Sequence, residues 1–115
     1  TGPYLLYSMA RANSIIKKAK SNKSFKIISI DEHERKLINE LSRLPEIVKE
    51  ASKQSSPNLI ANYSYNIAQI FNEFYHSSQV IGSEEEGFRL ALVKSFVQVM
   101  ENALGLLGIP VLKEM

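Results

Sequence analysis

The sequence contains no cysteine, which excludes disulfide frameworks, thiolate metal centres and cysteine nucleophiles. Its two histidines, His33 and His76, are far apart in the chain, and neither has the neighbours of a histidine metal site or a catalytic triad. The glycines are scattered and form no phosphate-binding loop. We therefore expect this chain to hold no metal or cofactor and to carry out no catalysis by itself.

Long apolar runs are absent as well. No uncharged run reaches the roughly 18 apolar residues that a membrane-spanning helix needs, and the sequence does not start with a signal-peptide pattern. The 115 residues are enough for one domain with a real core, but not for two. We expect a single cytoplasmic domain, residues 1–115, without a membrane partner.

Positive charge is concentrated in the first half of the chain. Residues 1–53 carry eleven Lys or Arg and six Asp or Glu, whereas residues 54–115 carry three and six. The stretch from Arg11 to Lys26 contains six cations and no acid. Clustered positive charge suits a polyanion such as nucleic acid. It also fits an ordinary solvated helix end, where lysine is favoured by the helix dipole.

Apolar periodicity predicts an all-α fold, a single bundle of about five helices. The last expected helix carries two adjacent apolar stripes, one through Leu92 and Phe96 and the other through Val93 and Met100. Such a wide apolar arc predicts that this helix is contacted on several sides and forms the central post of the bundle. The expected helices span about 3–20, 31–44, 45–52, 57–78 and 84–107.

Several helix starts carry capping signals. Asp31 with Glu34, and Ser83 with Glu86, stand at the spacing of a capping box, and the Ser-Pro pair at 56–57 is typical of a cap followed by a first-turn proline. The connection at 21–30 is rich in β-branched residues but has no second strand to pair with. We expect a loop there whose apolar side chains pack against the bundle.

One stripe of the first helix combines rings and cations. Tyr4, Tyr7, Arg11, Ser14 and Lys18 follow one another at helical spacing. A single-stranded nucleic acid uses this arrangement, because rings stack on bases while cations meet phosphates. The alternative is that the tyrosines are half-buried residues at the edge of the core with their hydroxyls in water.

Short motifs along the whole chain then carry a resemblance to a known family. They are Gly2–Tyr7 with Arg11, residues 44–48, Tyr65 with the run Phe71-Asn72-Glu73-Phe74-Tyr75-His76, and residues 89–93, 98–99 and 105–109, closing on Met115. Together they resemble the anticodon-binding domain, often called the DALR domain, of arginyl-tRNA synthetases, which are class I enzymes.

The resemblance implies a function. It implies an all-helical C-terminal domain that binds the anticodon stem-loop of arginine tRNA and binds no DNA. It also implies a longer parent protein, an arginine–tRNA ligase of protein biosynthesis, whose catalytic domain binds ATP and Mg and carries the ATP-handling motifs that these residues lack. The implied partners are therefore tRNA and the catalytic domain of the same parent chain.

The resemblance also implies site residues, position by position. The two tyrosines of the first helix line the anticodon loop, two basic positions follow them, the tyrosine near the end of the fourth helix meets a base, and the terminal carboxylate lies at the anticodon pocket. These positions are Tyr4, Tyr7, Arg11, Lys17, Tyr75 and Met115. We expect Tyr7, Tyr75 and Met115 to share one surface, with Met115 closer to Tyr7.

Two alternatives remain open at this point. The aromatic strip also fits a helical protein–protein interaction domain that holds a partner helix in an apolar groove. Binding that weakens steeply with salt separates nucleic acid from such a partner. The other alternative is the anticodon-binding domain of another class I synthetase, against which the closing segment from Gly105 to Met115 argues.

Overall fold

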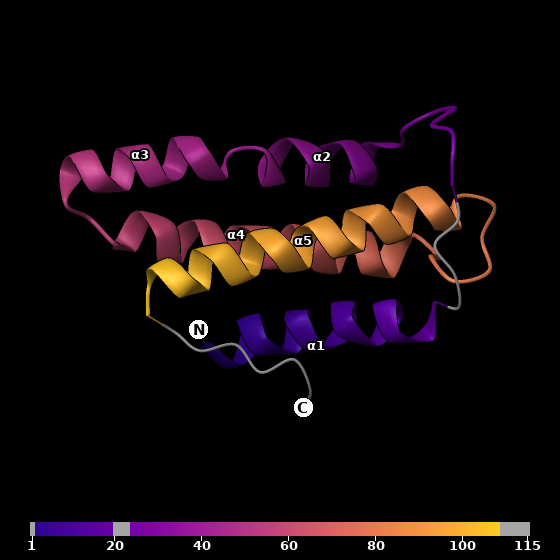
Figure 1. Cartoon of the computed structure of the whole chain (residues 1–115), viewed down its shortest axis with the longest axis horizontal. Coiled ribbons are helices and arrows are strands. Elements are labelled where there is room, and N and C mark those ends of the chain that lie inside the picture. Colours follow the sequence, from indigo (N-terminus) through magenta and orange to yellow (C-terminus); the bar gives the residue numbers. More distant parts are fainter. Residues whose placement is uncertain (1, 20–23, 109–115) are drawn as a thin grey trace.

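The fold is all-helical, as predicted. The computed structural model describes residues 2–19 and 24–108. Over these residues it contains five α-helices and no strand (Figure 1). The helices are α1 (Gly2–Lys18), α2 (Glu32–Leu41), α3 (Leu44–Gln54), α4 (Asn58–Ser77) and α5 (Glu86–Leu106).

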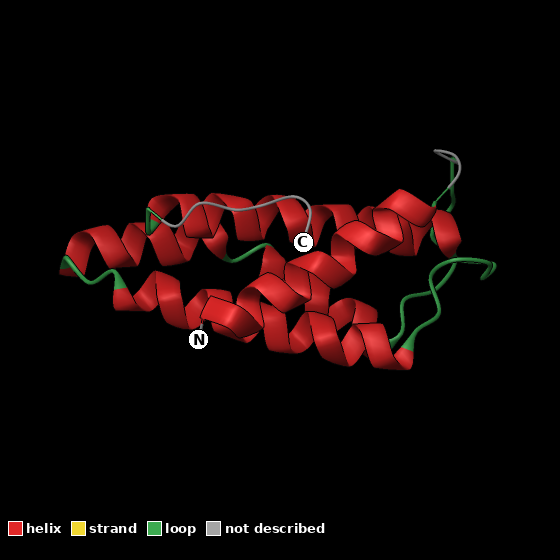
Figure 2. Cartoon of the chain, turned by 90° about the horizontal axis from the view of Figure 1, so that it is seen from below, coloured by secondary structure: helices red, strands yellow, loops and turns green. Residues whose placement is uncertain are grey.

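The helices form three layers. Figure 1 shows α4 and α5 side by side, with α2 and α3 end to end on one side of them and α1 on the other. α1 and α4 run in the same direction, and α5 runs back against both. Seen from below, α1 starts at the end marked N and crosses the neighbouring helices obliquely (Figure 2). This crossing places α1 against both α4 and α5.

The central helix is α4, so the expectation that the last helix forms the central post is wrong. α4 packs against each of the four other helices, whereas α5 packs mainly against α1, α2 and α4. Helical spacing from Ile60 to Phe74 predicts one apolar stripe on α4, and the structure buries all of it. In α5 the two stripes are buried over most of their length, but Leu106 is exposed. α5 thus needs its wide apolar arc for three neighbours rather than four.

A stack of two phenylalanines joins the central pair. Phe71 of α4 and Phe96 of α5 are fully buried, with ring centroids 4.1 Å apart and planes only 6° apart. Offset or parallel aromatic pairs add about 0.5–1.5 kcal/mol to the burial of their surface. The contact therefore fixes how far α4 is rotated about its own axis relative to α5.

The start of α5 differs from the prediction. The hydroxyl of Ser83 does not cap the helix but donates to the carbonyl of Val80 at 2.9 Å. The Glu86 carboxylate reaches past Ser83 and accepts from the backbone N–H of Gly82 at 2.6 Å. Gly82 has φ +83°, a left-handed conformation that glycine adopts without a steric penalty. The chain therefore makes a tight turn after Val80, and the helix begins only at Glu86.

The start of α4 also lies later than predicted. Its N-cap position is occupied by Pro57, and no side chain caps the helix there. Ser56 contributes through its backbone carbonyl, which accepts from the N–H of Leu59 at 3.3 Å. The predicted capping role of the Ser56 side chain is thus wrong. By contrast, Pro45, with which the expected helix 45–52 begins, lies in the first turn of α3.

The predicted capping box of α2 is present and is extended by an ion pair. Asp31 and Glu34 cap each other's backbone N–H groups at 2.8 Å. Glu34 is only 2% exposed, and its second oxygen accepts from Arg89 Nε of α5 at 2.8 Å. Arg89 also donates to the carbonyl of Gln79 at 2.7 Å. A buried carboxylate must be paired, so this arginine ties together α2, α5 and the chain that leaves α4.

The connection between α1 and α2 packs less than predicted. Ile30 packs against the core, and the ring of Phe25 lies 5.9 Å from that of Phe88. Ile27 is about half exposed, however, and Ile28 is 94% exposed. The expectation that the apolar residues of this loop tuck against the bundle therefore holds only for its two ends.

The burial pattern predicts unequal losses of stability for two aromatic residues. Phe96→Ala empties the site of a fully buried ring, and such changes typically cost about 3–5 kcal/mol. Tyr4 is only partly buried, so Tyr4→Ala should cost markedly less. Urea unfolding of both variants measures the two free energies of unfolding. Equal losses would mean that Phe96 does not hold the place in the core described above.

The environment of Tyr63 predicts that the stability of the fold depends on pH. Its hydroxyl lies at the C-terminal end of α2, 2.6 Å from the Glu40 carbonyl oxygen, to which it donates, and 3.2 Å from that of Leu41. Burial, aided by the Glu40 carboxylate and opposed by Arg43, raises the pKa of Tyr63 to about 12. Between pH 10 and 12 the unfolded chain therefore loses this proton while the folded chain keeps it, and stability falls as pH rises.

Tyr63→Phe removes this ionisation and one hydrogen bond, which is worth about 0.5–1.5 kcal/mol at neutral pH. We predict that the stability advantage of the natural chain over Tyr63→Phe shrinks by about 1 kcal/mol between pH 9 and pH 11. Urea unfolding of both proteins at several pH values gives the difference, in which the other tyrosines and the lysines cancel. A difference that stays constant with pH would contradict the assignment.

Candidate functional site

The residues of the predicted aromatic strip meet a second row of side chains on α4. On α1, Tyr4, Ser8 and Arg11 follow one line, because residues four and three apart share a helix face. On α4, Asn72 and Tyr75 do the same, and Tyr65 lies two turns before Asn72. α1 and α4 pack against each other and run in the same direction, so the early residues of each helix meet and the later residues of each meet.

Asn72 connects the two rows. Its Nδ2 donates to the hydroxyl of Tyr4 at 2.7 Å and to the hydroxyl of Ser8 at 3.1 Å. Its Oδ1 accepts from Arg11 Nη1 at 3.2 Å. The guanidinium has only donors, so it requires the amide oxygen on its side and leaves both amide hydrogens for the two hydroxyls. One side chain therefore satisfies three partners on the neighbouring helix.

Two ring contacts complete the arrangement. The ring of Tyr4 lies 5.1 Å from the ring of Tyr65, centroid to centroid. The guanidinium carbon of Arg11 lies 5.0 Å from the centroid of the Tyr75 ring, which is the geometry of a cation–π contact. Tyr75 is 37% exposed. A cation and aromatic rings thus lie together at the surface, held from below by Asn72.

Tyr7 lies beside this group but is not held by it. Its side chain is 67% exposed, and among the described residues none makes a ring contact or a hydrogen bond with it. It stands one turn after Tyr4 on the same side of α1. Together these residues form what we call the α1–α4 surface, defined as Tyr4, Tyr7, Arg11, Tyr65, Asn72 and Tyr75.

The structure does not bring every predicted site residue to this surface. At 100° and 1.5 Å per residue, Lys17 lies about 9 Å further along α1 than Arg11 and about 120° around the helix axis. It is exposed and has its own interactions. Met115 lies outside the described residues, so the expectation that it is closer to Tyr7 than to Tyr75 stays a prediction.

Sequence reasoning missed two members of the surface, Asn72 and Tyr65. Both lie within the motifs that carried the family resemblance, but neither was singled out. The available signal was their spacing: Tyr65, Asn72 and Tyr75 are seven and three residues apart, which places them on one face of α4 beside its buried stripe. That signal does not reveal which helix this face meets.

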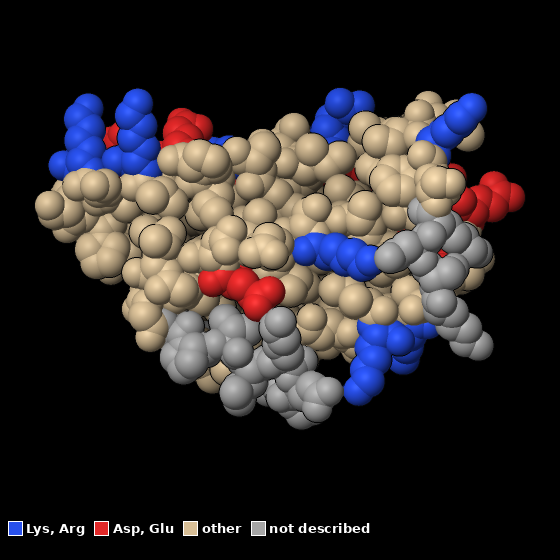
Figure 3. Space-filling view, in the orientation of Figure 1, with Lys and Arg blue, Asp and Glu red and all other residues tan. Residues whose placement is uncertain are grey.

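Cations do not form one continuous patch on the face that Figure 3 shows. Lys and Arg side chains gather along one edge, over α2 and α3, and at the C-terminal end of α1, while the middle of this face, over α5, is mostly uncharged. The basic stretch from Arg11 to Lys26 is thus spread over a helix and a loop. Its members at positions 20 and 23 lie outside the described residues.

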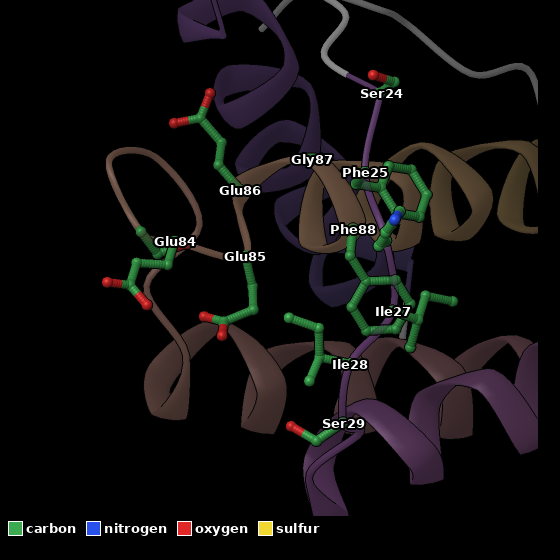
Figure 4. A pocket seen from close by; sticks show the side chains of 12 residues that line it. Ser24, Phe25, Ile27, Ile28, Ser29, Glu84, Glu85, Glu86, Gly87 and Phe88 are labelled. Carbon is green, nitrogen blue, oxygen red and sulfur yellow. The ribbon is translucent and has the colours of Figure 1, made fainter.

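A pocket of about 360 Å³ lies between residues 24–29 and 83–88, at the end of the bundle where α5 begins. Figure 4 shows Phe25 and Ile27 beside Phe88 on one side and the side chains of Glu84–Glu86 on the other. In the part of the chain that the structure describes, no group of three His, Cys, Asp or Glu side chains is placed to hold a metal ion. None of the described helices is long and apolar enough to cross a membrane.

The comparison with known proteins is consistent along the whole chain. The family model described as the DALR anticodon binding domain matches residues 5–115. Among curated relatives, the arginine–tRNA ligase of Pediococcus pentosaceus is 42% identical over all of this chain, and that of Thermococcus sibiricus is 38% identical over 95% of it. The chain spans about a fifth of the length of these relatives, 21% and 19%.

A solved structure agrees with the sequence comparison. The arginyl-tRNA synthetase of Thermus thermophilus superposes on all of this chain with a TM-score of 0.92 and 32% identity, and the matched part is 21% of that protein. Fold and sequence therefore point to the same part of the same kind of protein.

Proposed function

This chain belongs to the DALR anticodon-binding domain family, in the form found in arginyl-tRNA synthetases, and we propose that its α1–α4 surface binds the anticodon loop of an arginine tRNA. We propose further that residues 1–115 are the C-terminal domain of a longer cytoplasmic synthetase. The catalytic part of that parent would bind ATP and Mg and charge the tRNA that this domain holds. The support for a longer parent is that the chain spans about a fifth of its relatives.

The observation that carries the proposal is the grouping of exposed rings with one oriented cation. A base stacked on an aromatic side chain contributes roughly 1–3 kcal/mol, and loop bases are free to be splayed out for such stacking. Tyr7 offers an exposed ring, and Tyr75 offers a partly exposed ring beside the Arg11 guanidinium. Arg11 uses one N–H group on Asn72, and a guanidinium has five, so it retains donors for a phosphate or a base edge.

The contacts suggest different roles for the two tyrosines of α1. Tyr4 places its ring against Tyr65 and its hydroxyl against Asn72, so it supports the surface more than it presents a free face. Tyr7 has no such partner among the described residues and is the better platform for a base. Lys17, further along and around α1, would contact phosphates outside the loop, and Met115 remains a proposed contact of the anticodon.

The alternative of a protein–protein interaction domain predicts a different response to salt. Phosphate contacts release counterions, so RNA affinity falls linearly on a logarithmic scale as salt rises. An apolar groove that holds a partner helix lacks this dependence. The alternative of another class I synthetase is disfavoured because the relatives described above are arginine enzymes.

We predict that the chain binds an arginine-tRNA anticodon stem-loop, more weakly as salt rises from 50 to 200 mM and more weakly when loop bases are replaced. Tyr7→Ala and Tyr75→Ala should each weaken binding about 5- to 150-fold, the equivalent of one lost stacked base. Tyr7→Ala should leave the unfolding midpoint nearly unchanged, because its side chain is 67% exposed. Fluorescence anisotropy titrations measure the affinity, and the deletion of Met115 tests the terminal contact in the same assay.

The control is Ile28→Ala, which removes an even more exposed apolar side chain from the connection between α1 and α2. It should leave binding unchanged. Binding that ignores both salt and loop sequence would overturn the proposed function. Loop-specific binding that both tyrosine variants retain in full would instead show that the α1–α4 surface is the wrong site.

A further inference from the structure

We propose that Asn72 is a positioning residue: it holds Arg11 and Tyr4 of α1 in register with Tyr75 of α4, so that the binding surface exists before RNA arrives. This inference rests on the proposed function of the α1–α4 surface. It concerns a residue whose role does not require contact with RNA, because its three hydrogen bonds all point into the protein.

The first step of the argument is that Arg11 has few other restraints. A long guanidinium side chain at a helix surface samples many rotamers, and ordering it costs free energy when a ligand binds. Here two contacts hold it, the Asn72 Oδ1 acceptor at 3.2 Å and the Tyr75 ring at 5.0 Å. Both contacts come from α4, so Arg11 is oriented by the helix that it faces rather than by its own.

The second step is that Asn72 is matched to its partners in donor and acceptor count. It places two donors on the hydroxyls of Tyr4 and Ser8 and its oxygen on the guanidinium. Ser8 is fully buried, and its hydroxyl also donates to the Tyr4 carbonyl at 3.2 Å. An apolar residue at position 72 would leave this buried hydroxyl without one partner and would release Tyr4 and Arg11.

The third step is that Arg11 remains a net positive charge because its partner is an amide. An amide oxygen orients the guanidinium without neutralising it. A carboxylate at the same position would form a strong ion pair and would compete with RNA phosphates for the same charge. Asparagine therefore suits a residue that must position a cation and leave that cation available.

This reasoning separates positioning from simple stability through Asn72→Asp. A carboxylate accepts from the Tyr4 hydroxyl and forms an ion pair with Arg11, while the one hydrogen of the Ser8 hydroxyl stays on the Tyr4 carbonyl. The stronger bond to Arg11 offsets the bond lost at Ser8, so the variant should be about as stable as the natural chain. Binding to the anticodon stem-loop should nevertheless weaken about 2- to 10-fold. The slope of log affinity against log salt should become shallower by about 0.7, because one phosphate contact is lost.

Asn66→Asp is the matched control. It makes the same chemical change on the same helix, at an exposed position six residues earlier, away from Arg11. It adds the same charge to the protein, so it should reduce affinity only through general repulsion of RNA, and by less than Asn72→Asp does. The number of phosphate contacts, and with it the salt slope, should stay the same. Comparing the two variants by anisotropy titration over 50–200 mM salt isolates the effect of position 72.

A double-mutant cycle completes the experiment. Asn72→Ala should weaken binding about 2- to 10-fold in the natural chain and clearly less when Arg11 is already Gln, because one of the two groups that it positions is then gone. Two outcomes would overturn the role of Asn72 but not the proposed function, provided that the natural chain binds the loop. One is that the losses of the two single variants simply add in the double variant, and the other is that Asn72→Asp and Asn66→Asp have equal salt slopes. A natural chain that shows no loop-specific binding would overturn the proposed function and this inference with it.

Discussion

The α1–α4 surface depends on one contact in the core, the stack of Phe71 on Phe96. α4 touches every other helix, and this stack fixes its rotation against α5. Asn72 follows Phe71 directly in the sequence, so its side chain lies about 100° further around the helix. When the phenylalanine is held in the core, the asparagine is necessarily turned toward α1. Core packing thus sets the direction in which the polar residues of α4 point.

The surface that results is organised rather than merely charged. A basic stretch by itself attracts any polyanion, but it does not select a loop with splayed bases. Here rings from two helices lie beside one guanidinium whose orientation is fixed from α4. Fixing these groups in advance lowers the entropy that RNA binding must otherwise supply. The exposed ring of Tyr7 and the oriented guanidinium of Arg11 then have complementary roles. The ring stacks on a base, and the guanidinium binds a phosphate or a base edge.

The sequence predicts the local features of this protein well. The all-helical fold, the buried stripe of α4 and the capping box of Asp31 with Glu34 are all set by residues within a few positions of each other. The start of α5 was mispredicted because Ser83 and Glu86 also have capping-box spacing, yet both side chains bond to the preceding turn instead. The ion pair from Arg89 to Glu34, which joins residues 55 apart in the sequence, anchors that end of α5 and is invisible to local pattern analysis.

The same limit applies to the site. Rings and cations at helical spacing, together with the family resemblance, identify Tyr4, Tyr7, Arg11 and Tyr75. Asn72 escapes because its partners lie 61, 64 and 68 residues away, and no local rule connects them. The central place of α4 escapes for a similar reason, since α5 is apolar over a wider arc while α4 has more neighbours.

The most direct test of the account is an NMR titration of the ¹⁵N-labelled chain with an arginine-tRNA anticodon stem-loop, read residue by residue from the backbone amides. If the α1–α4 surface binds the loop, the largest shifts should lie in residues 3–12 of α1 and 64–77 of α4, and a stem-loop with replaced loop bases should shift them less. Shifts confined to α2, α3 and the connection at 24–30, with α1 and α4 unchanged, would contradict the account.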